Sequence, residues 1–215
     1  MSKLPVIAID GPAASGKGTI ARRVAAALQF AHLDTGTLYR VVGLAVLRND
    51  GDPGDAVAAE TAVASLDLSL LEDTALRAHA TSVAASKVAA IMSVREALLS
   101  FQRNFAAHPP GGRGAVLDGR DIGTVICPDA DVKLFVTATP QVRARRRFLE
   151  LTANGSLITE AEVLADIQAR DARDSGRAVA PLKQAADATL LDTTHLDIEA
   201  ATERALSIVR AALRT

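Results

Sequence analysis

The sequence has 215 residues, 49% of them hydrophobic, which is enough for one compact domain whose core needs no covalent staples. Twenty-four basic and 25 acidic residues give a net charge of −1, and with five Phe, one Tyr and no Trp this composition favours neither duplex nor single-stranded nucleic acid as a partner. One cysteine excludes an internal disulfide, and no apolar stretch approaches the roughly 20 residues that cross a bilayer.

The first predicted elements are a strand over residues 6–9, a glycine-rich loop and a helix over residues 17–29. The loop has the spacing Gly11-x-x-x-x-Gly16-Lys17, in which small residues let consecutive backbone N–H groups face one anion. The helix directs the positive end of its dipole to the same point, and Lys17 adds a full charge that can reach outer phosphates. An ordinary Gly-rich turn is the alternative, which the lysine and the flanking elements disfavour. The stretch therefore predicts a phosphate-binding loop.

One position of this loop departs from the Walker pattern, which has Ser or Thr directly after the lysine. Here Gly18 separates Lys17 from Thr19, and this form resembles the loop of nucleoside monophosphate kinases. The hydroxyl of Thr19 is therefore a candidate ligand for Mg²⁺, either directly or through a water molecule.

A second short strand is predicted from residue 31, followed by a helix that Asp34 or Thr35 caps and that continues to about residue 47. Tyr39 and Arg40 fall on the first turn of this helix, close to the carboxyl end of the strand. Ligands bind at this edge of open parallel α/β sheets, so both residues are candidates for a binding site. The alternative for Arg40 is a solvated helix arginine.

Turn-forming residues at 49–55 break the chain, and residues 56–82 are predicted to form an inserted, mobile region. Within it we expect a helix to about residue 65, apolar alternation over residues 66–71 and a strand at residues 75–78.

Residues 83–105 have the apolar spacing of one long helix, with a kink near Met92-Ser93. The helix must end before Pro109-Pro110, because proline cannot continue it.

A further strand is predicted over residues 115–117, and it ends in Asp118, Arg120 and Asp121. P-loop enzymes keep an acidic residue at the end of such a strand, where it orients Mg²⁺ or its waters. Asp118 is therefore the second candidate near a metal ion. A turn of the Asp-Gly type is the alternative.

Residues 132–137 predict another strand, and Thr139-Pro140 opens a helix with Thr as N-cap and Pro at the first position. That helix carries four arginines within five residues, namely Arg143, Arg145, Arg146 and Arg147. They form either a solvated face or a clamp on the negative charge that phosphoryl transfer brings together.

A break is predicted at Asn154-Gly-Ser, and a new helix over residues 159–174 begins with a capping box of Thr159 and Glu162. Its end carries a polar cluster at residues 170–177, with three arginines and two aspartates.

A final strand over residues 188–192 and an amphipathic helix through residue 213 complete the chain. About five short strands alternate with helices, so we predict an α/β fold of the P-loop NTPase type, with a five-stranded parallel sheet and helices on both faces. The histidines have no metal-ligand spacing, and the N-terminus enters a strand without the hydrophobic region of a signal peptide, which predicts a cytoplasmic protein.

Three polar clusters, at residues 34–40, 118–121 and 170–177, and the phosphate loop suggest two anionic ligands that face one another, as phosphoryl transfer requires. With these clusters the chain closely resembles the bacterial cytidylate kinases, which are CMP and dCMP kinases. The matching motifs run in order through nearly the whole chain: Gly11-Pro-Ala-Ala-Ser-Gly-Lys-Gly-Thr19, Asp34-Thr-Gly-Thr-Leu-Tyr-Arg40, Ala84-Ala-Ser-Lys-Val88 with Val94-Arg95, Asp118-Gly-Arg-Asp121, and Arg170-Asp-Ala-Arg-Asp174 with Arg177-Ala-Val-Ala-Pro-Leu182.

The resemblance implies roles for four sets of residues. The ATP phosphates bind to Gly11, Pro12, Ala13, Ala14, Ser15, Gly16, Lys17, Gly18 and Thr19. The acceptor nucleotide binds to Thr35, Tyr39, Arg40, Ser86, Arg95, Arg120, Asp121, Arg170, Asp174 and Arg177. The catalytic set is Lys17, Arg120, Arg143, Arg147 and Arg170, and the Mg²⁺ cofactor lies near Thr19 and Asp118.

Within the acceptor set, Ser86, Arg95 and Asp121 match the groups that read cytosine. A carboxylate accepts a hydrogen bond from the exocyclic amine, while Ser and Arg can satisfy the ring nitrogen and the carbonyl. Thr35 stands at the family's Ser position near the base, and Asp174 matches the residue that holds the sugar hydroxyls. The phosphate contacts are matched by Arg40, Arg120, Arg170 and Arg177.

We expect one domain, with a core at about residues 1–55, 83–140 and 178–215. The monophosphate-binding insert spans about residues 56–82, and it is shorter than the β-rich insert of long-type family members. A lid at about residues 141–177, which includes Arg143 and Arg147, closes on ATP.

The predicted reaction is ATP·Mg²⁺ + CMP or dCMP giving ADP + CDP or dCDP, in pyrimidine nucleotide metabolism, by a cytoplasmic monomer without nucleic-acid or membrane partners. A phosphate oxygen of CMP is already an anionic nucleophile, so catalysis needs positioning and charge neutralisation rather than a strong base. One alternative is a P-loop kinase for another small acceptor, such as UMP, AMP, shikimate or a coenzyme precursor. The other is a nucleotide-dependent switch, against which the sequence lacks a guanine-reading Asn-Lys-x-Asp run.

Overall fold

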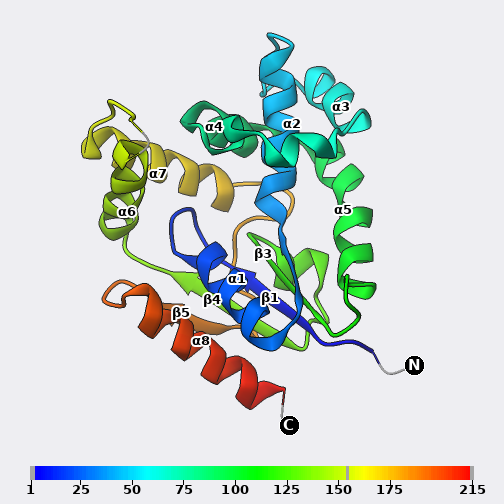
Figure 1. The fold of residues 1–215 in the computed structure, drawn as a ribbon. Coiled ribbons are helices and arrows are strands. Elements are labelled where there is room, and N and C mark those ends of the chain that lie inside the picture. Colours follow the sequence, from blue (N-terminus) through cyan, green and yellow to red (C-terminus); the bar gives the residue numbers. More distant parts are fainter. Residues whose placement is uncertain (1–2, 154, 214–215) are drawn as a thin grey trace. The chain divides into compact units, whose positions relative to one another are not determined.

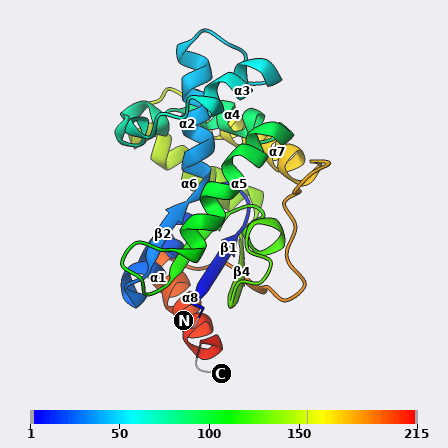
Figure 2. The same cartoon turned by 90° about the vertical axis from the view of Figure 1, so that its right-hand side faces the viewer.

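The computed structural model describes residues 3–153 and 155–213. The chain forms two compact units. One consists of the residues up to Leu33 and those from Asn104 onward, and the other runs from Asp34 to Arg103. Figures 1 and 2 show the elements of both units.

A five-stranded sheet is the centre of the first unit, and its strand order is β2-β3-β1-β4-β5. The central strand β1 pairs in parallel with β3 and with β4, and β4 pairs in parallel with β5. The predicted α/β fold with a five-stranded parallel sheet is therefore confirmed. The strands are β1 (Val6–Asp10), β2 (Ala31–Asp34), β3 (Ala115–Gly119), β4 (Val132–Thr137) and β5 (Thr189–Asp192).

Helices α1 (Lys17–Leu28) and α8 (Ile198–Ala212) cover one face of this sheet, as Figure 1 shows. The fully buried side chains of Ile7 and Ile9 on β1 pack there with residues of both helices in one hydrophobic cluster. Successive side chains of a strand point to opposite faces, so Asp10 points away from this cluster. The short helix η3 (Ile122–Ile126) lies on that second face, because its first N–H groups donate to the Asp10 carboxylate.

The remaining helices of the first unit are α6 (Pro140–Ala153) and α7 (Glu160–Ser175). The α6 start is as predicted, since the Thr139 hydroxyl accepts a hydrogen bond from the Val142 N–H at 3.5 Å. The predicted capping box at the start of α7 is confirmed, because Thr159 and Glu162 bond each other's backbone N–H. Of the predicted break after α6, Asn154 lies outside the described residues, whereas Gly155 has φ 81° and follows the helix end.

The second unit is built from helices. Its elements are α2 (Thr35–Arg48), α3 (Ala56–Ala64), η1 (Leu68–Glu72), η2 (Thr74–Arg77), α4 (His79–Val88) and α5 (Met92–Ala107), the last of which continues into the first unit.

The predicted strand at residues 75–78 and the apolar alternation at residues 66–71 are wrong, because both stretches form 3₁₀ turns. The Asp67 carboxylate accepts from the Ser69 N–H at 2.9 Å, and the Asp73 carboxylate accepts from the Ala75 N–H at 2.8 Å. Such side-chain caps favour turns over strands.

The single long helix predicted over residues 83–105 is also wrong, because α4 ends at Val88 and α5 begins at Met92. The chain tightens between them, with the Ile91 N–H bonded to the Val88 carbonyl at 3.1 Å. The buried Arg95 guanidinium donates to the Ala89 carbonyl at 3.1 Å. That bond satisfies a carbonyl that a continuous helix would have paired internally.

The predicted side-chain cap of α2 is wrong for both candidates. Asp34 occupies the N-cap position and its side chain makes no capping bond, whereas Thr35 is the first residue of the helix and not its cap. The Asp34 carboxylate instead accepts from the Arg40 guanidinium at 3.3 Å.

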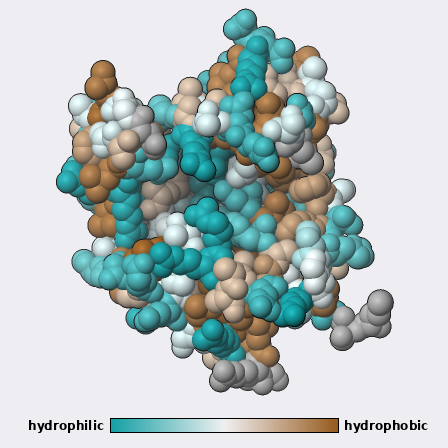
Figure 3. Space-filling model, viewed as in Figure 1, coloured by the Kyte–Doolittle hydropathy of each residue, from teal (hydrophilic) through white to brown (hydrophobic). Residues whose placement is uncertain are grey.

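None of the helices in residues 3–153 and 155–213 has both the length and the apolar character that a membrane span requires. Hydrophobic residues on the face drawn in Figure 3 lie among hydrophilic ones.

Helices α2 and α4 approach each other closely at Gly43. A methyl group at this position would lie 2.9 Å from the Ala85 nitrogen and 3.0 Å from the Ala84 carbonyl carbon, and neither backbone atom can move aside cheaply. We therefore expect Gly43→Ala to lower the free energy of unfolding by about 1–3 kcal/mol in urea denaturation, although alanine is the better helix former.

Gly36→Ala is the matched control in the same helix, since its methyl group would meet only the movable ends of the Asp34 and Arg40 side chains. Equal stability of the two variants would contradict the prediction.

Candidate active site

The predicted phosphate loop connects β1 directly to α1. Gly11 has φ 155°, and a methyl group there would lie 2.0 Å from the Val136 carbonyl oxygen on β4, so no side chain fits. Gly16 has φ 90° and forms the N-cap of α1 in the left-handed region that favours glycine. The two glycines of the motif are therefore required by the backbone itself.

Contacts to its carbonyl groups hold this loop in place. The Thr193 hydroxyl donates to the Ser15 carbonyl at 3.0 Å, the Arg143 guanidinium donates to the Ala13 carbonyl at 3.3 Å, and the Lys17 ammonium donates to the Pro12 carbonyl at 3.3 Å. The Ser15 side chain is fully buried, and its hydroxyl has no hydrogen-bond partner among the described residues. A loop held by its carbonyls can present its N–H groups to an anion.

Asp118 lies beside the first turn of α1. It belongs to β3 and is buried, so the alternative of an Asp-Gly turn is wrong. A methyl group at Gly18 would lie 3.5 Å from Asp118 Oδ2, which places the carboxylate next to the helix turn that carries Thr19. The other carboxylate oxygen, Oδ1, is 2.8 Å from His32 Nε2 on β2. His32 was not among the predicted site residues.

The chemistry of these residues fits a magnesium ion that phosphate oxygens and waters would also ligate. Among the described residues, no group of three or more His, Cys, Asp or Glu side chains could hold a metal ion alone. Mg²⁺ in nucleotide sites typically takes one or two protein oxygens together with phosphates and waters. A hydroxyl at Thr19 and a carboxylate at Asp118 are hard oxygen donors of this kind.

Three of the predicted arginines surround Asp174 at the end of α7. The Asp174 carboxylate is 2.8 Å from Arg120 Nε and 3.8 Å from Arg170 Nε, and it also forms an ion pair with Arg177. Burial by itself raises the pKa of this carboxyl, but the charges of the three guanidinium groups outweigh it and hold the pKa below its usual range. The structure thus brings together four of the residues predicted to bind the acceptor.

Two of the four arginines of α6, Arg143 and Arg146, do not belong to the solvated face that was the alternative interpretation. The buried Arg143 makes two bonds to the Asp171 carboxylate, at 3.1 and 2.7 Å, and its Nε donates to the Ala138 carbonyl at 2.8 Å. Arg146 donates to the hydroxyl and the carbonyl of Thr193 at 3.0 and 2.7 Å. Arg145 forms an exposed pair with Glu160, and the partly buried Arg147 pairs with the exposed Glu150, each at 2.8 Å.

The Asp10 carboxylate binds the backbone directly after Asp121. Asp121 is buried directly before η3, and Asp10 accepts hydrogen bonds from the next two backbone N–H groups, those of Ile122 and Gly123, at 2.8 Å each. Burial raises the pKa of Asp10 to about 6, against the opposing effect of these two bonds. Asp10 was not predicted as a site residue, although a carboxylate at the end of an otherwise apolar strand was a visible signal.

The second unit holds the other predicted acceptor residues, which lie on α2, α4 and α5. The Arg95 guanidinium lies over the Tyr39 ring, 5.6 Å from its centre, and both residues are buried. Thr35 and Ser86 are buried as well. Arg40 is about one-third exposed and pairs with Asp34, so it is not simply a solvated helix arginine.

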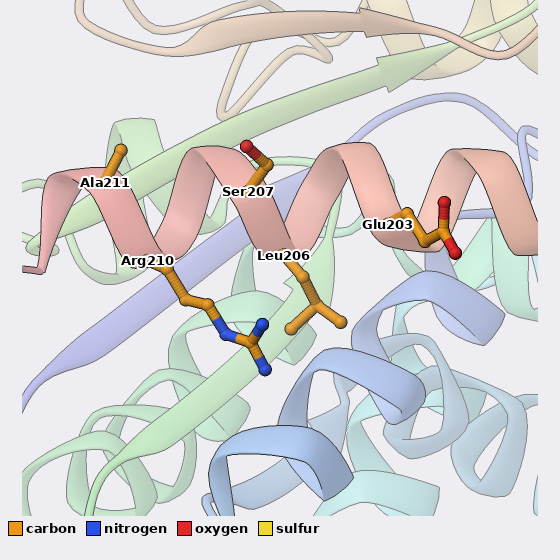
Figure 4. A pocket seen from close by; sticks show the side chains of 5 residues that line it. All are labelled: Glu203, Leu206, Ser207, Arg210 and Ala211. Atoms are coloured by element: carbon orange, nitrogen blue, oxygen red, sulfur yellow. The ribbon is translucent and has the colours of Figure 1, made fainter.

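A surface pocket elsewhere in the first unit contains none of the predicted site residues. It is lined by Glu203, Leu206, Ser207, Arg210 and Ala211, which all come from α8, as Figure 4 shows. We assign no part of the predicted chemistry to it.

A phosphate loop of this spacing at the carboxyl end of a parallel sheet, beside a strand-end carboxylate, is the arrangement of the P-loop kinases, and the arginine cluster suits a phosphorylated acceptor. Comparison with known proteins narrows this class. Residues 7–211 match the model of the cytidylate kinase family, and the chain belongs to that family.

Curated relatives agree along nearly the full length. The chain is 58% identical over 205 residues to the cytidylate kinase of Rhodospirillum rubrum, covering 95% of this chain and 96% of that one. It is 59% identical over 204 residues to the cytidylate kinase of Nitrobacter winogradskyi, covering 95% of each chain. The family resemblance found in the sequence is therefore confirmed, whereas the roles of individual residues stay predictions.

A solved structure of an uncharacterized protein from Eubacterium ventriosum is similar in fold, with a TM-score of 0.54 at 15% identity. The superposition covers 97% of this chain and 99% of that one.

Asp174 balances three guanidinium groups, so we expect Asp174→Asn to lower the free energy of unfolding by about 3–5 kcal/mol at neutral pH. Because the folded-state pKa lies below the ordinary value of 3.8, the stabilisation is complete above that pH and is lost as the pH falls through the lowered pKa. Urea denaturation of both proteins over a pH series measures the difference.

Glu199→Gln is the control, since Glu199 pairs with Arg23 on the surface and should matter little. A stability difference for Asp174→Asn that does not shrink in acid would refute the assigned cause.

Proposed function

We propose that this chain transfers the γ-phosphoryl group of ATP to CMP or dCMP, giving ADP and CDP or dCDP. The observation that carries the proposal is a complete phosphate loop in the same unit as three partly buried arginines around the buried Asp174, in a member of the cytidylate kinase family. One anion site suits the donor, and the other suits the phosphate of the acceptor.

On the donor side, the phosphate loop binds the ATP phosphates through its backbone N–H groups and through Lys17. Lys17 is held near the loop by the Pro12 carbonyl, and it can exchange this contact for a phosphate oxygen. Thr19 and Asp118 would hold Mg²⁺, which screens the charge of the donor phosphates when it is bound. The contact from His32 restricts the orientation of the Asp118 carboxylate.

On the acceptor side, Arg120, Arg170 and Arg177 bind the phosphate of CMP. Their positive charges, gathered around Asp174, attract the anion and stabilise the charge that develops during transfer. A CMP phosphate oxygen attacks the γ-phosphorus, and the bond to the ADP oxygen breaks. The protein contributes alignment and charge rather than a base.

Base recognition is assigned to Asp121, Ser86 and Arg95, and the sugar hydroxyls to Asp174. Thr35, Tyr39 and Arg40 complete the acceptor set. The Tyr39 ring supports the Arg95 guanidinium, which lies over it. The proposal also includes the core, insert and lid divisions predicted from the sequence, and a monomer that acts on free nucleotides in the cytoplasm.

Within the lid, α6 and α7 form their own small hydrophobic cluster, which contains Ala144, Leu151, Val163 and Ile167. Arg147 is a candidate contact to ATP in the closed lid, because its present partner Glu150 is a mostly exposed side chain that it can leave. Arg143 is bound on several sides, so it acts by supporting the loop and the lid.

An acceptor panel tests the reaction directly. ADP formation from ATP·Mg²⁺ is measured with CMP, dCMP, UMP, AMP and shikimate offered separately to the purified protein. We expect CMP and dCMP to be the preferred acceptors. Preference for another acceptor would keep the P-loop kinase and reject the pyrimidine assignment, and ATP binding without transfer to any acceptor would favour the nucleotide-dependent switch.

Lys17 is expected to act mainly in the transition state. We expect Lys17→Ala to lower kcat with CMP by at least about 100-fold, because an electrostatic contact to the transferred group is lost, while the melting temperature is retained. Steady-state kinetics and thermal denaturation check both parts.

The control is Lys183→Ala, since Lys183 is an exposed lysine to which no role is assigned. A Lys17→Ala variant with ordinary turnover would remove this lysine from the mechanism.

A further inference from the structure

The Asp10 carboxylate connects the start of the phosphate loop to the segment that follows Asp121. Asp10 is 4% exposed and directly precedes Gly11. Its Oδ1 accepts from the Ile122 N–H and its Oδ2 from the Gly123 N–H, each at 2.8 Å, across 112 and 113 positions of sequence. One carboxylate thus binds two consecutive amides of a distant segment.

Those two amides belong to the start of η3, where a helix has no internal partners for its N–H groups. The internal bonds begin later, with the Val125 and Ile126 N–H groups bonded to the Asp121 carbonyl at 2.9 and 3.1 Å. Asp121 occupies the N-cap position, yet its side chain makes no capping bond to η3. Asp10 therefore supplies from β1 the cap that the N-cap residue normally supplies itself.

Asp10 is suited to this task because its own position is fixed. It is the last residue of β1 and aligns with Gly119 on β3 and with Phe135 on β4. The other side of the contact is tight as well, since a methyl group at Gly123 would lie 3.1 Å from Lys133 Cδ and 3.4 Å from Asp10 Oδ2. The chain at residues 121–123 thus has little freedom to shift.

We propose that Asp10 is a positioning residue for acceptor selectivity: by capping η3 it fixes the backbone next to Asp121 and sets the direction of the Asp121 carboxylate. This inference rests on the proposed function, in which Asp121 recognises the exocyclic amine of the acceptor base. It gives Asp121 a fixed orientation without requiring its own side chain to act as the cap.

The donor site depends less on this contact, although Asp10 is next to the phosphate loop. The loop has separate supports in Thr193 and Arg143, which bind the Ser15 and Ala13 carbonyls. The η3 start has the Asp10 carboxylate as the cap of its first two amides. Loss of the carboxylate should therefore affect acceptor recognition more than ATP binding.

The first test is Asp10→Asn, which keeps one acceptor oxygen but turns an NH₂ group toward the second amide, so that two donors face each other. We expect kcat/KM for CMP to fall by about 10- to 100-fold and the preference for CMP over UMP to weaken, while the KM for ATP stays within about threefold. Amide hydrogen exchange at Ile122 and Gly123 should become faster.

Asp131→Asn is the matched control. Asp131 Oδ2 accepts from the Val6 N–H at 2.8 Å, so the same substitution alters the same kind of bond at the opposite end of β1. We expect this variant to keep the CMP to UMP preference of the unaltered protein. Equal effects of the two substitutions, or an Asp10→Asn variant with unchanged selectivity, would overturn the proposal.

If Asp10→Asn does not fold, Gly123→Ala tests the same contact. Its methyl group would lie 3.1 Å from Lys133 Cδ and 3.4 Å from Asp10 Oδ2, so it crowds the contact without removing a charge. A weaker CMP preference at an ordinary KM for ATP supports the proposal, and an unchanged preference overturns it. The two hypotheses fail in different ways. If the unaltered protein transfers phosphate to none of the acceptors, the proposed function is rejected. If the variants keep normal CMP turnover and normal selectivity, only the role of Asp10 is rejected.

Discussion

The position of β1 between β3 and β4 is the constraint on which the rest of the first unit depends. The strand is fully buried and hydrogen-bonded on both edges, so the point at which it ends is fixed to within the register of its neighbours. Gly11 follows immediately and passes so close to the Val136 carbonyl that no side chain fits. The phosphate loop therefore starts from an immobile base, and the first turn of α1 brings Lys17, Gly18 and Thr19 to the same edge as Asp118.

Three buried carboxylates near this edge are compensated in three different ways. Asp10 receives two backbone N–H groups, Asp118 contacts a histidine ring, and Asp174 lies among three guanidinium groups. A buried charge without such partners costs several kcal/mol, as an order of magnitude. The Asp174 cluster differs from the other two because three guanidinium groups lie around one carboxylate, and guanidinium groups suit a phosphate ligand. The other two carboxylates hold parts of the site in place.

Local patterns predicted the elements whose signals are contained within a few residues. The Gly11 to Thr19 loop and the capping box of Thr159 and Glu162 are examples, because the spacing of a few neighbouring residues determines their local backbone conformation. The contact of His32 with Asp118 spans 86 positions and that of Asp10 with Ile122 spans 112. The periodicity of the sequence cannot predict such pairs, because the order of the strands in the sheet is what brings the two residues together.

Errors in the second unit have a related origin. The apolar residues between positions 66 and 78 suggested strands. Aspartate side chains accept hydrogen bonds from the nearby backbone N–H groups, and these bonds favour turns. The break between α4 and α5 escaped detection because the alanine-rich sequence there suits a helix, and the bond that stabilises the break comes from Arg95, several residues further on. Helical spacing describes which face is buried, but it does not show where a distant side chain competes for a carbonyl.

The contacts of Arg143 affect how mutagenesis of this family should be interpreted. One guanidinium reaches the Ala13 carbonyl of the phosphate loop, the Ala138 carbonyl after β4 and the Asp171 carboxylate on α7. A substitution there removes a support of the loop and a contact between α6 and α7 in the same step. A kinetic defect in an Arg143 variant therefore combines several effects. A double-mutant cycle with Asp171 is needed to separate the loss of the guanidinium charge from the loss of these contacts.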